Sequence, residues 1–116
     1  MRDSKLYLKD ILEAMDAIDG FVEGMNLESF KNDDLRSSAV IRKFEIIGEA
    51  SKNLPESIRQ QYASIPWKEM AGMRDRLIHF YFGIKYDLVW TTIKDVIPQI
   101  RPLINKVLED LEKAVQ

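Results

Sequence analysis

Apolar residues recur every three or four positions along most of this chain, which is the spacing of one face of an α-helix. The first stripe predicts a helix over residues 4–23, with Asp3 or Ser4 as its N-cap and with Gly20 and Gly24 weakening its end. The stripe consists of Leu8, Ile11, Leu12, Met15, Ile18 and Val22. Its apolar face needs other helices to cover it.

A second stripe follows a break that begins at Asn26. It predicts a helix over residues 34–53, with Asp33 or Asp34 as the N-cap. Its apolar positions are Ala39, Val40, Phe44, Ile47 and Ala50 or Ser51.

Two prolines then mark the starts of two shorter helices, because the fixed φ of proline suits a first helical turn. One helix is predicted over residues 55–62 from Pro55, and the other over residues 66–78 from Pro66. The expected core residues of the latter are Trp67, Met70 and Leu77.

The C-terminal stripe predicts one long helix over residues 87–114, capped by Asp87. Pro98 and Pro102 lie inside it, and we predict a bend near residues 94–98 because a proline removes a helical hydrogen bond. The stripe stays in phase through Val89, Ile93, Val96, Ile97, Ile100, Leu103 or Ile104, Val107, Leu111 and Ala114.

No segment shows a strand-like alternation of useful length, and the aromatic stretch HFYFGIKY before the last helix is interpreted as a connection. We therefore predict an all-α, up-and-down bundle of four to five helices with a long, bent C-terminal helix, in a single domain over residues 1–116. Aromatic residues near positions 80–90 leave room for a dimer interface.

Composition narrows the chemistry that such a bundle could carry. The 116 residues are 46% hydrophobic and 31% charged, which is typical of a folded protein. There is no cysteine and one histidine, which excludes disulfides, thiol nucleophiles and zinc sites built from cysteines or several histidines. Because there is no apolar signal-peptide stretch and no apolar run of about 20 residues, we expect a cytoplasmic protein with no membrane partner.

Charge is unevenly distributed, although the net charge is only −2. Residues 1–35 carry a net charge of −5, residues 36–85 carry +4 and residues 86–116 carry −1. A basic middle segment permits a local anion site, whereas a mixed, solvated surface is the simpler interpretation.

The most reactive side chains lie in the middle segment, between Arg74 and Tyr81. Imidazole is the usual general acid or base near neutral pH, and guanidinium binds phosphate oxygens in two-pronged fashion. Arg74 and the only histidine, His79, are five residues apart, which on a continuous helix separates them by about 140° around the axis. They can converge only if the helix ends near 77–78 and the chain then folds back, a turn that Gly83 permits.

A single chain also lacks the two histidines that would serve as separate acid and base. A two-fold dimer that brings two copies of the segment together would supply two histidines and two arginines. The simpler interpretation is that His79 is a packed, hydrogen-bonded residue and that Arg74, Asp75 and Arg76 form a surface ion-pair cluster.

Glu45 and Glu49 are spaced i, i+4 on the second long helix and could form a carboxylate pair. Solvation, or pairing with Arg42 or Lys52, is the simpler interpretation. Two carboxylates and one histidine fall short of a convincing metal site, so no metal and no cofactor are expected.

The pattern Arg74-x4-His79-x-Tyr81 reproduces the R-x4-H-x-Y motif, and the chain resembles the HepT-like proteins of the HEPN superfamily. The neighbouring words EIIGEA, PW, GMRDR, YFG and VW occur in the expected order, so the resemblance covers essentially the whole chain. Lys85 departs from the pattern, because relatives often carry an acidic residue there. It lies outside the motif and alters the loop charge.

The resemblance implies an all-helical homodimer that acts as the toxin of a type VII toxin–antitoxin pair. It further implies a metal-independent endoribonuclease that cleaves RNA (tRNA or mRNA) and leaves a 2′,3′-cyclic phosphate. Arg74 and His79 would be the catalytic pair in a composite dimer site, with Asp75 and Arg76 in support. The implied partner is an MntA-like nucleotidyltransferase antitoxin, which uses ATP to attach AMP to Tyr81.

Two other hypotheses stay open on the sequence. The chain could be a non-catalytic helical module that binds a nucleotidyltransferase partner or a nucleotide at Arg74 and Tyr81, which fits its acidic overall charge. It could also be a structural dimerisation domain. Salt dependence of RNA binding separates these readings, because phosphate contacts give a steep slope.

Overall fold

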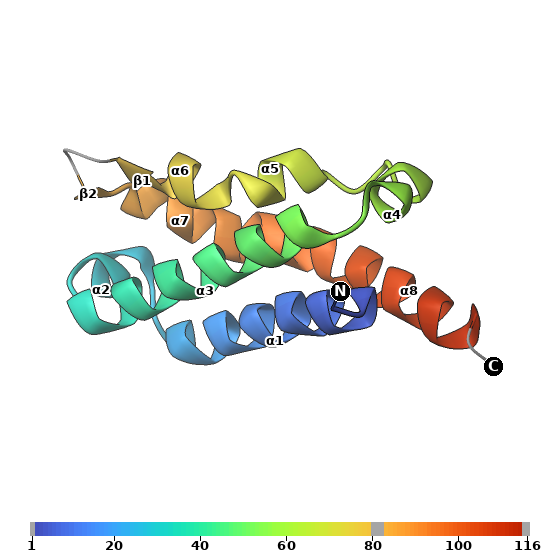
Figure 1. Ribbon diagram of the computed structural model, residues 1–116. Helices are drawn as coiled ribbons and strands as arrows, with labels where there is room; N and C mark the ends of the chain where they lie inside the picture. Colours follow the sequence, from blue (N-terminus) through green and yellow to red (C-terminus); the bar gives the residue numbers. More distant parts are fainter. Residues whose placement is uncertain (1, 80–82, 115–116) are drawn as a thin grey trace.

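The computed structural model describes residues 2–79 and 83–114 as a bundle of helices (Figure 1). The elements in chain order are α1 (Ser4–Val22), α2 (Leu27–Lys31), α3 (Asp34–Asn53), α4 (Glu56–Gln61), α5 (Trp67–Ala71), α6 (Met73–Leu77), β1 (Ile78–His79), β2 (Gly83–Ile84), α7 (Tyr86–Thr91), the π-helical turn η1 (Thr92–Val96) and α8 (Ile97–Ala114). The predicted all-α class is confirmed. None of the described helices is both long and apolar enough to cross a membrane.

α1 and α3 run antiparallel and pack against each other along most of their length (Figure 1). α8 packs on α1 from behind, and α5 and α6 form a further layer on α3. The core between these layers is continuous. Its fully buried large side chains are Phe30, Phe44, Leu8, Ile11, Met15, Ile18, Ile47, Leu54, Met70, Leu77, Ile97 and Ile104.

Aspartate residues are the N-caps of the two long N-terminal helices. Of the N-cap candidates in the sequence, the structure has Asp3 for α1 and Asp33 for α3. Asp3 accepts a hydrogen bond from the Lys5 backbone N–H at 2.9 Å, and Asp33 accepts one from the Arg36 N–H at 2.9 Å. The helix predicted over 34–53 has these bounds in the structure.

The break after α1 spans residues 23–26, and it is followed by a short helix, α2, that the sequence analysis did not predict and for which Asn26 is the N-cap. Asn26 and Ser29 form a reciprocal capping box, with Ser29 N–H donating to Asn26 Oδ1 at 2.8 Å and Asn26 N–H donating to Ser29 Oγ at 3.0 Å. Phe30 is fully buried and packs against the rings of Tyr86 and Trp90. Five residues are too few to show a helical period, so the capping box is the sequence signal for α2.

The single helix predicted over 66–78 is two helices, because the chain is interrupted at Gly72 between α5 and α6. The expected core residues are nonetheless buried: Trp67, Met70 and Leu77 are 6%, 0% and 2% exposed. The interruption leaves the phase of the apolar positions unchanged, which is why periodicity alone did not reveal it.

The C-terminal helical segment begins one residue before its predicted start, and Asp87 is not its cap. Lys85 is the N-cap residue of α7, and the carboxylate of Asp87 pairs instead with Lys31 of α2 at 3.1 Å. Where the sequence predicts a bend, near residues 94–98, the helical segment contains the π-helical turn η1, just before Pro98. Such a turn changes the hydrogen-bond pattern where proline has no N–H to give.

Candidate active site

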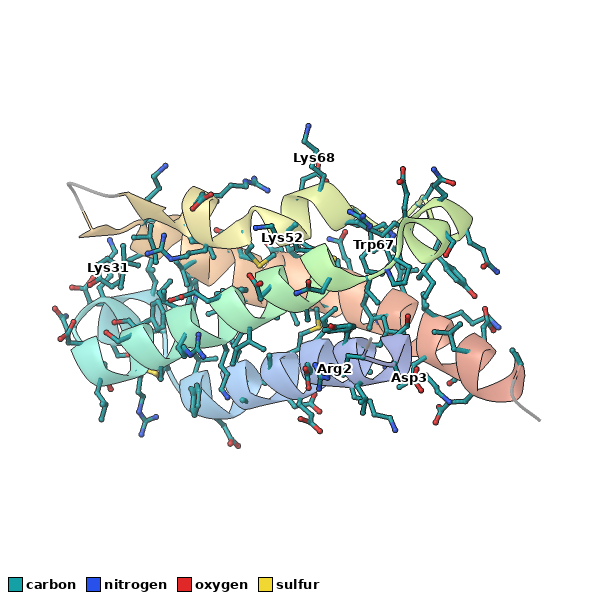
Figure 2. The ribbon with its side chains drawn as sticks, in the orientation of Figure 1. Arg2, Asp3, Lys31, Lys52, Trp67 and Lys68 are labelled. Carbon is teal, nitrogen blue, oxygen red and sulfur yellow. The ribbon has the colours of Figure 1, made fainter. Side chains whose placement is uncertain are left out.

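α3 and α5 approach each other closely at Gly48, and this contact sets the position of the candidate site. A Cβ atom on Gly48 would lie 3.1 Å from the carbonyl oxygen of Ala71 and 3.3 Å from that of Met70. A residue without a side chain is therefore what lets the two backbones come this near. At the start of α5, Trp67 is buried while Lys68 points to solvent (Figure 2). The end of α5 rests on α3, and α6 follows directly.

Arg74 of α6 lies between two carboxylates. Its Nε atom is 3.8 Å from Oε2 of Glu45 on α3, and its Nη1 atom is 3.7 Å from Oδ1 of the neighbouring Asp75. Both distances exceed hydrogen-bond length, so the guanidinium is attracted to the two carboxylates without being bound tightly by either. The Glu45 side chain is 35% exposed and that of Asp75 is 86% exposed, so water and salt screen Glu45 less.

An open hollow of about 380 Å³ lies beside Arg74, between α3 and the α5–α6 pair. Arg42 and Lys52 line it from α3, together with the carboxylates of Glu45 and Glu49 (Lys52 is labelled in Figure 2). The positive charge of the middle segment is thus interleaved with carboxylates at this site. Arg74 is the cation that lines the hollow from α6.

Arg76 lies at a different place from Arg74, although only one residue separates them. It lines a second, mainly apolar hollow of about 230 Å³, where α5 and α6 meet α7, η1 and α8. Glu69, Leu88 and Ile100 line the same hollow. The structure therefore brings Arg74 and Asp75 together and places Arg76 apart from them.

The helix that carries Arg74 ends at Leu77, which confirms the predicted helix terminus. Ile78 has the extended backbone angles φ −117° and ψ 127°, and its N–H donates to the carbonyl of Arg74. The backbone of His79 therefore continues as a strand rather than as the next helical turn. The separation of about 140° that a continuous helix would impose does not apply to this pair.

A small hairpin follows, with His79 opposite Gly83 in antiparallel pairing. Gly83 has φ +78°, the left-handed conformation that glycine adopts without strain. The Lys85 N–H donates to the Leu77 carbonyl at 2.9 Å, which closes the hairpin on the end of α6. The stretch interpreted as a plain connection thus contains two two-residue strands, too short to show alternation. Tyr81 lies outside the described residues.

The two glutamates on α3 have different partners. Glu45 Oε2 is 3.9 Å from Arg42 Nη1, as one of the sequence interpretations held, and it also faces Arg74. Glu49 Oε1 accepts from the Asn53 side-chain amide at 3.5 Å. Across residues 2–79 and 83–114, no three metal-ligating side chains converge.

Sequence reasoning missed the pairing of Glu45 with Arg74 and the close approach at Gly48. Both residues stand in the EIIGEA word, but their partners are about 25 residues away in the chain. A glycine in the middle of a helical stripe was the available signal, because glycine there is unfavourable unless backbones come close.

The fold and the site together define a class: an all-helical protein in which an arginine-bearing helix ends in a hairpin that carries the single histidine. The family model described as "Ribonuclease HepT-like" matches residues 11–107. The chain belongs to the HepT-like ribonuclease family, and ribonuclease is the enzyme class that the comparisons support.

Three curated relatives illustrate the similarity. A "Putative RNase" of Methanocaldococcus jannaschii is 50% identical over 96% of this chain and 92% of its own. The "Probable ribonuclease HepT" of Thermococcus cleftensis is 45% identical over 91% of this chain and 96% of its own. A "Putative RNase" of Caldanaerobacter subterraneus subsp. tengcongensis is 41% identical over 94% and 97%. No solved structure matches the chain.

Proposed function

We propose that this protein is a metal-independent endoribonuclease, the toxin of a type VII toxin–antitoxin pair, with Arg74 and His79 as its catalytic residues. The observation that carries the proposal is the end of α6 at Leu77, which releases His79 from the helix on which Arg74 stands. Family membership supports RNA as the substrate.

The chemistry follows from the two side-chain types. A histidine removes the proton from a ribose 2′-hydroxyl, whose oxygen attacks the adjacent phosphorus and displaces the 5′-oxygen of the next nucleotide. The products are a 2′,3′-cyclic phosphate and a 5′-hydroxyl end, with a protonated imidazole supplying the leaving-group proton. Arg74 neutralises the charge that develops on the non-bridging oxygens.

The proposed site is composite because each chain has one histidine. In a two-fold homodimer, His79 of each copy faces the other, so that one imidazole acts as base while the second acts as acid. Asp75 orients a basic group of the site, and Arg76 has a supporting role from its separate position.

The proposed regulation acts through Tyr81. An MntA-like nucleotidyltransferase antitoxin transfers AMP from ATP to this tyrosine, two residues after His79. The added phosphodiester brings negative charge and bulk next to the Arg74–His79 pair, where it competes with RNA phosphate.

The test is a cleavage assay in EDTA on total tRNA and on an mRNA, after intact-mass analysis has established whether Tyr81 carries AMP. We expect the unmodified protein to cut RNA with cyclic-phosphate ends, and His79→Ala and Arg74→Gln to lose cutting while keeping their helical circular dichroism. Lys113→Ala, in the last turn of α8, is the matched charge control, because the C-terminal end of α8 lies at the opposite end of the molecule from β1 and β2 (Figure 1).

Cutting by pure His79→Ala protein would refute the proposal. RNA or nucleotide binding without turnover by the unmodified protein would favour the non-catalytic binding module instead. Protein that is heavier by AMP and does not cut would support the antitoxin mechanism directly.

A further inference from the structure

Among the residues that the structure describes, Glu45 is the one carboxylate that reaches Arg74 from another helix. It stands on α3, and its Oε2 atom lies 3.8 Å from the Nε atom of Arg74 on α6. Asp75, the other carboxylate near this guanidinium, belongs to the same short helix as Arg74 and is 86% exposed. Water and salt therefore screen the attraction of Asp75 to Arg74 more than that of the half-buried Glu45.

The backbone around Glu45 is fixed by close packing. Gly48, one helical turn after Glu45, lies against the backbone carbonyls at the end of α5, and Ala71 is three residues before Arg74. On either side of Arg74, the buried residues Met73 and Leu77 anchor α6 to the core. The backbone positions of Glu45 and Arg74 are therefore set by packed helices and not by a loop.

The geometry of the contact suits a carboxylate that orients the Arg74 guanidinium without blocking the N–H groups that would bind phosphate. Glu45 faces Nε, at the inner end of the guanidinium, and so leaves the terminal Nη groups for the two oxygens of a phosphate. At 3.8 Å it competes weakly for those N–H groups. Arg42, at 3.9 Å from the same Oε2 atom, partly balances the glutamate charge.

We propose that Glu45 is a positioning residue for Arg74, which holds the guanidinium so that its Nη end faces the scissile phosphate. This inference rests on the proposed ribonuclease function and adds to it a residue from outside the R-x4-H-x-Y segment. A guanidinium in the wrong orientation would still attract RNA, but its N–H groups would no longer point at the phosphate oxygens on which negative charge develops. The loss of Glu45 should therefore lower the rate of cleavage rather than the affinity for RNA.

The test compares Glu45→Gln with Glu112→Gln, which removes the same charge from an exposed position on α8, away from the hollow beside Arg74. Single-turnover cleavage by Glu45→Gln should fall about 10- to 100-fold. Its affinity for a non-cleavable 2′-O-methyl oligonucleotide should stay within about threefold, because removing a negative charge does not weaken phosphate binding. Glu112→Gln should match the wild type, and Glu45→Asp, which keeps a carboxylate, should lose less of the rate than Glu45→Gln.

A readout that needs no activity accompanies the assay: the ¹⁵N NMR signal of the Arg74 Nε–H, assigned with Arg74→Lys. It should move in Glu45→Gln and stay in place in Glu112→Gln. An unmoved NMR signal or a wild-type cleavage rate in Glu45→Gln would overturn the positioning role. So would a loss of RNA affinity as large as the loss of rate, together with a lowered melting temperature. If the wild type cuts no RNA, the ribonuclease proposal fails, and the NMR comparison still decides whether Glu45 holds Arg74.

Discussion

The substitution of glycine by alanine should have opposite effects at two positions in this bundle. Alanine is the better helix former by roughly 1 kcal/mol in a helix interior, and by less near a helix end. At Gly20, two residues before the end of α1, a Cβ would meet nothing within 4 Å. We therefore expect Gly20→Ala to stabilise the protein by about 0.5 kcal/mol.

At Gly48 the same methyl group meets backbone. The Cβ would lie 3.1 Å from the Ala71 carbonyl oxygen and 3.3 Å from that of Met70, both closer than an ordinary van der Waals contact. These atoms cannot rotate away as the tip of a side chain can, so α5 must shift by a few tenths of an ångström. Overpacking of this kind costs about 1–3 kcal/mol, which exceeds the gain in helix propensity. The expected net destabilisation is about 1 kcal/mol.

Urea denaturation of the wild type and both variants, at one protein concentration, measures these effects. With a slope of about 2 kcal/mol per molar urea, Gly48→Ala should lower the midpoint by about 0.5 M while Gly20→Ala raises it. Equal concentrations matter because any self-association would contribute to the apparent stability. A Gly48→Ala protein as stable as the wild type would show that α3 and α5 do not pack backbone to backbone.

Two further predictions concern contacts away from the site. The pKa of Asp110 lies below its usual value because the Lys106 ammonium and the Tyr62 hydroxyl hydrogen-bond to it, so the stability it contributes is present at neutral pH and is lost as the pH falls through that lowered pKa. Asp110→Asn should therefore melt below the wild type at pH 7, and the difference should vanish at acid pH in a melting series; a constant difference would contradict this. Asn26→Ala removes the capping box of α2 and should destabilise by about 1 kcal/mol in urea, whereas Ser29→Ala, which keeps the Asn26 side-chain acceptor, should cost less.

The two long N-terminal helices, α1 and α3, were predictable because each carries both an apolar stripe and a capping aspartate. In α3, the apolar period runs without interruption behind Asp33, and the sequence bounds agree with the structure. α2 was missed because a five-residue helix has no measurable period. The interruption at Gly72 was missed for the opposite reason, since the apolar positions before and after it stay in phase.

One structural feature of the candidate site was predictable, because the reasoning was local. Arg74 and His79 could converge only if the helix ended between them, and α6 ends at Leu77. The contact between Glu45 and Arg74 was not predictable in this way, because it joins two residues that are 29 positions apart in the chain and stand on different helices. Such a pairing depends on how α3 and α6 pack, and a single sequence does not specify that packing.

The arrangement of the two catalytic candidates suggests a division of work within the proposed dimer. Arg74 stands on a helix whose neighbouring residues Met73 and Leu77 are buried, and Glu45 faces it from a second helix. The His79 backbone instead lies in a hairpin of two-residue strands, joined to the bundle end through the Lys85–Leu77 hydrogen bond. An arginine that binds phosphate benefits from a rigidly held backbone, because its orientation governs its effect on a charged transition state. A histidine that must meet its counterpart from a second chain benefits from a position that projects beyond the helical layers, where the partner chain can reach it.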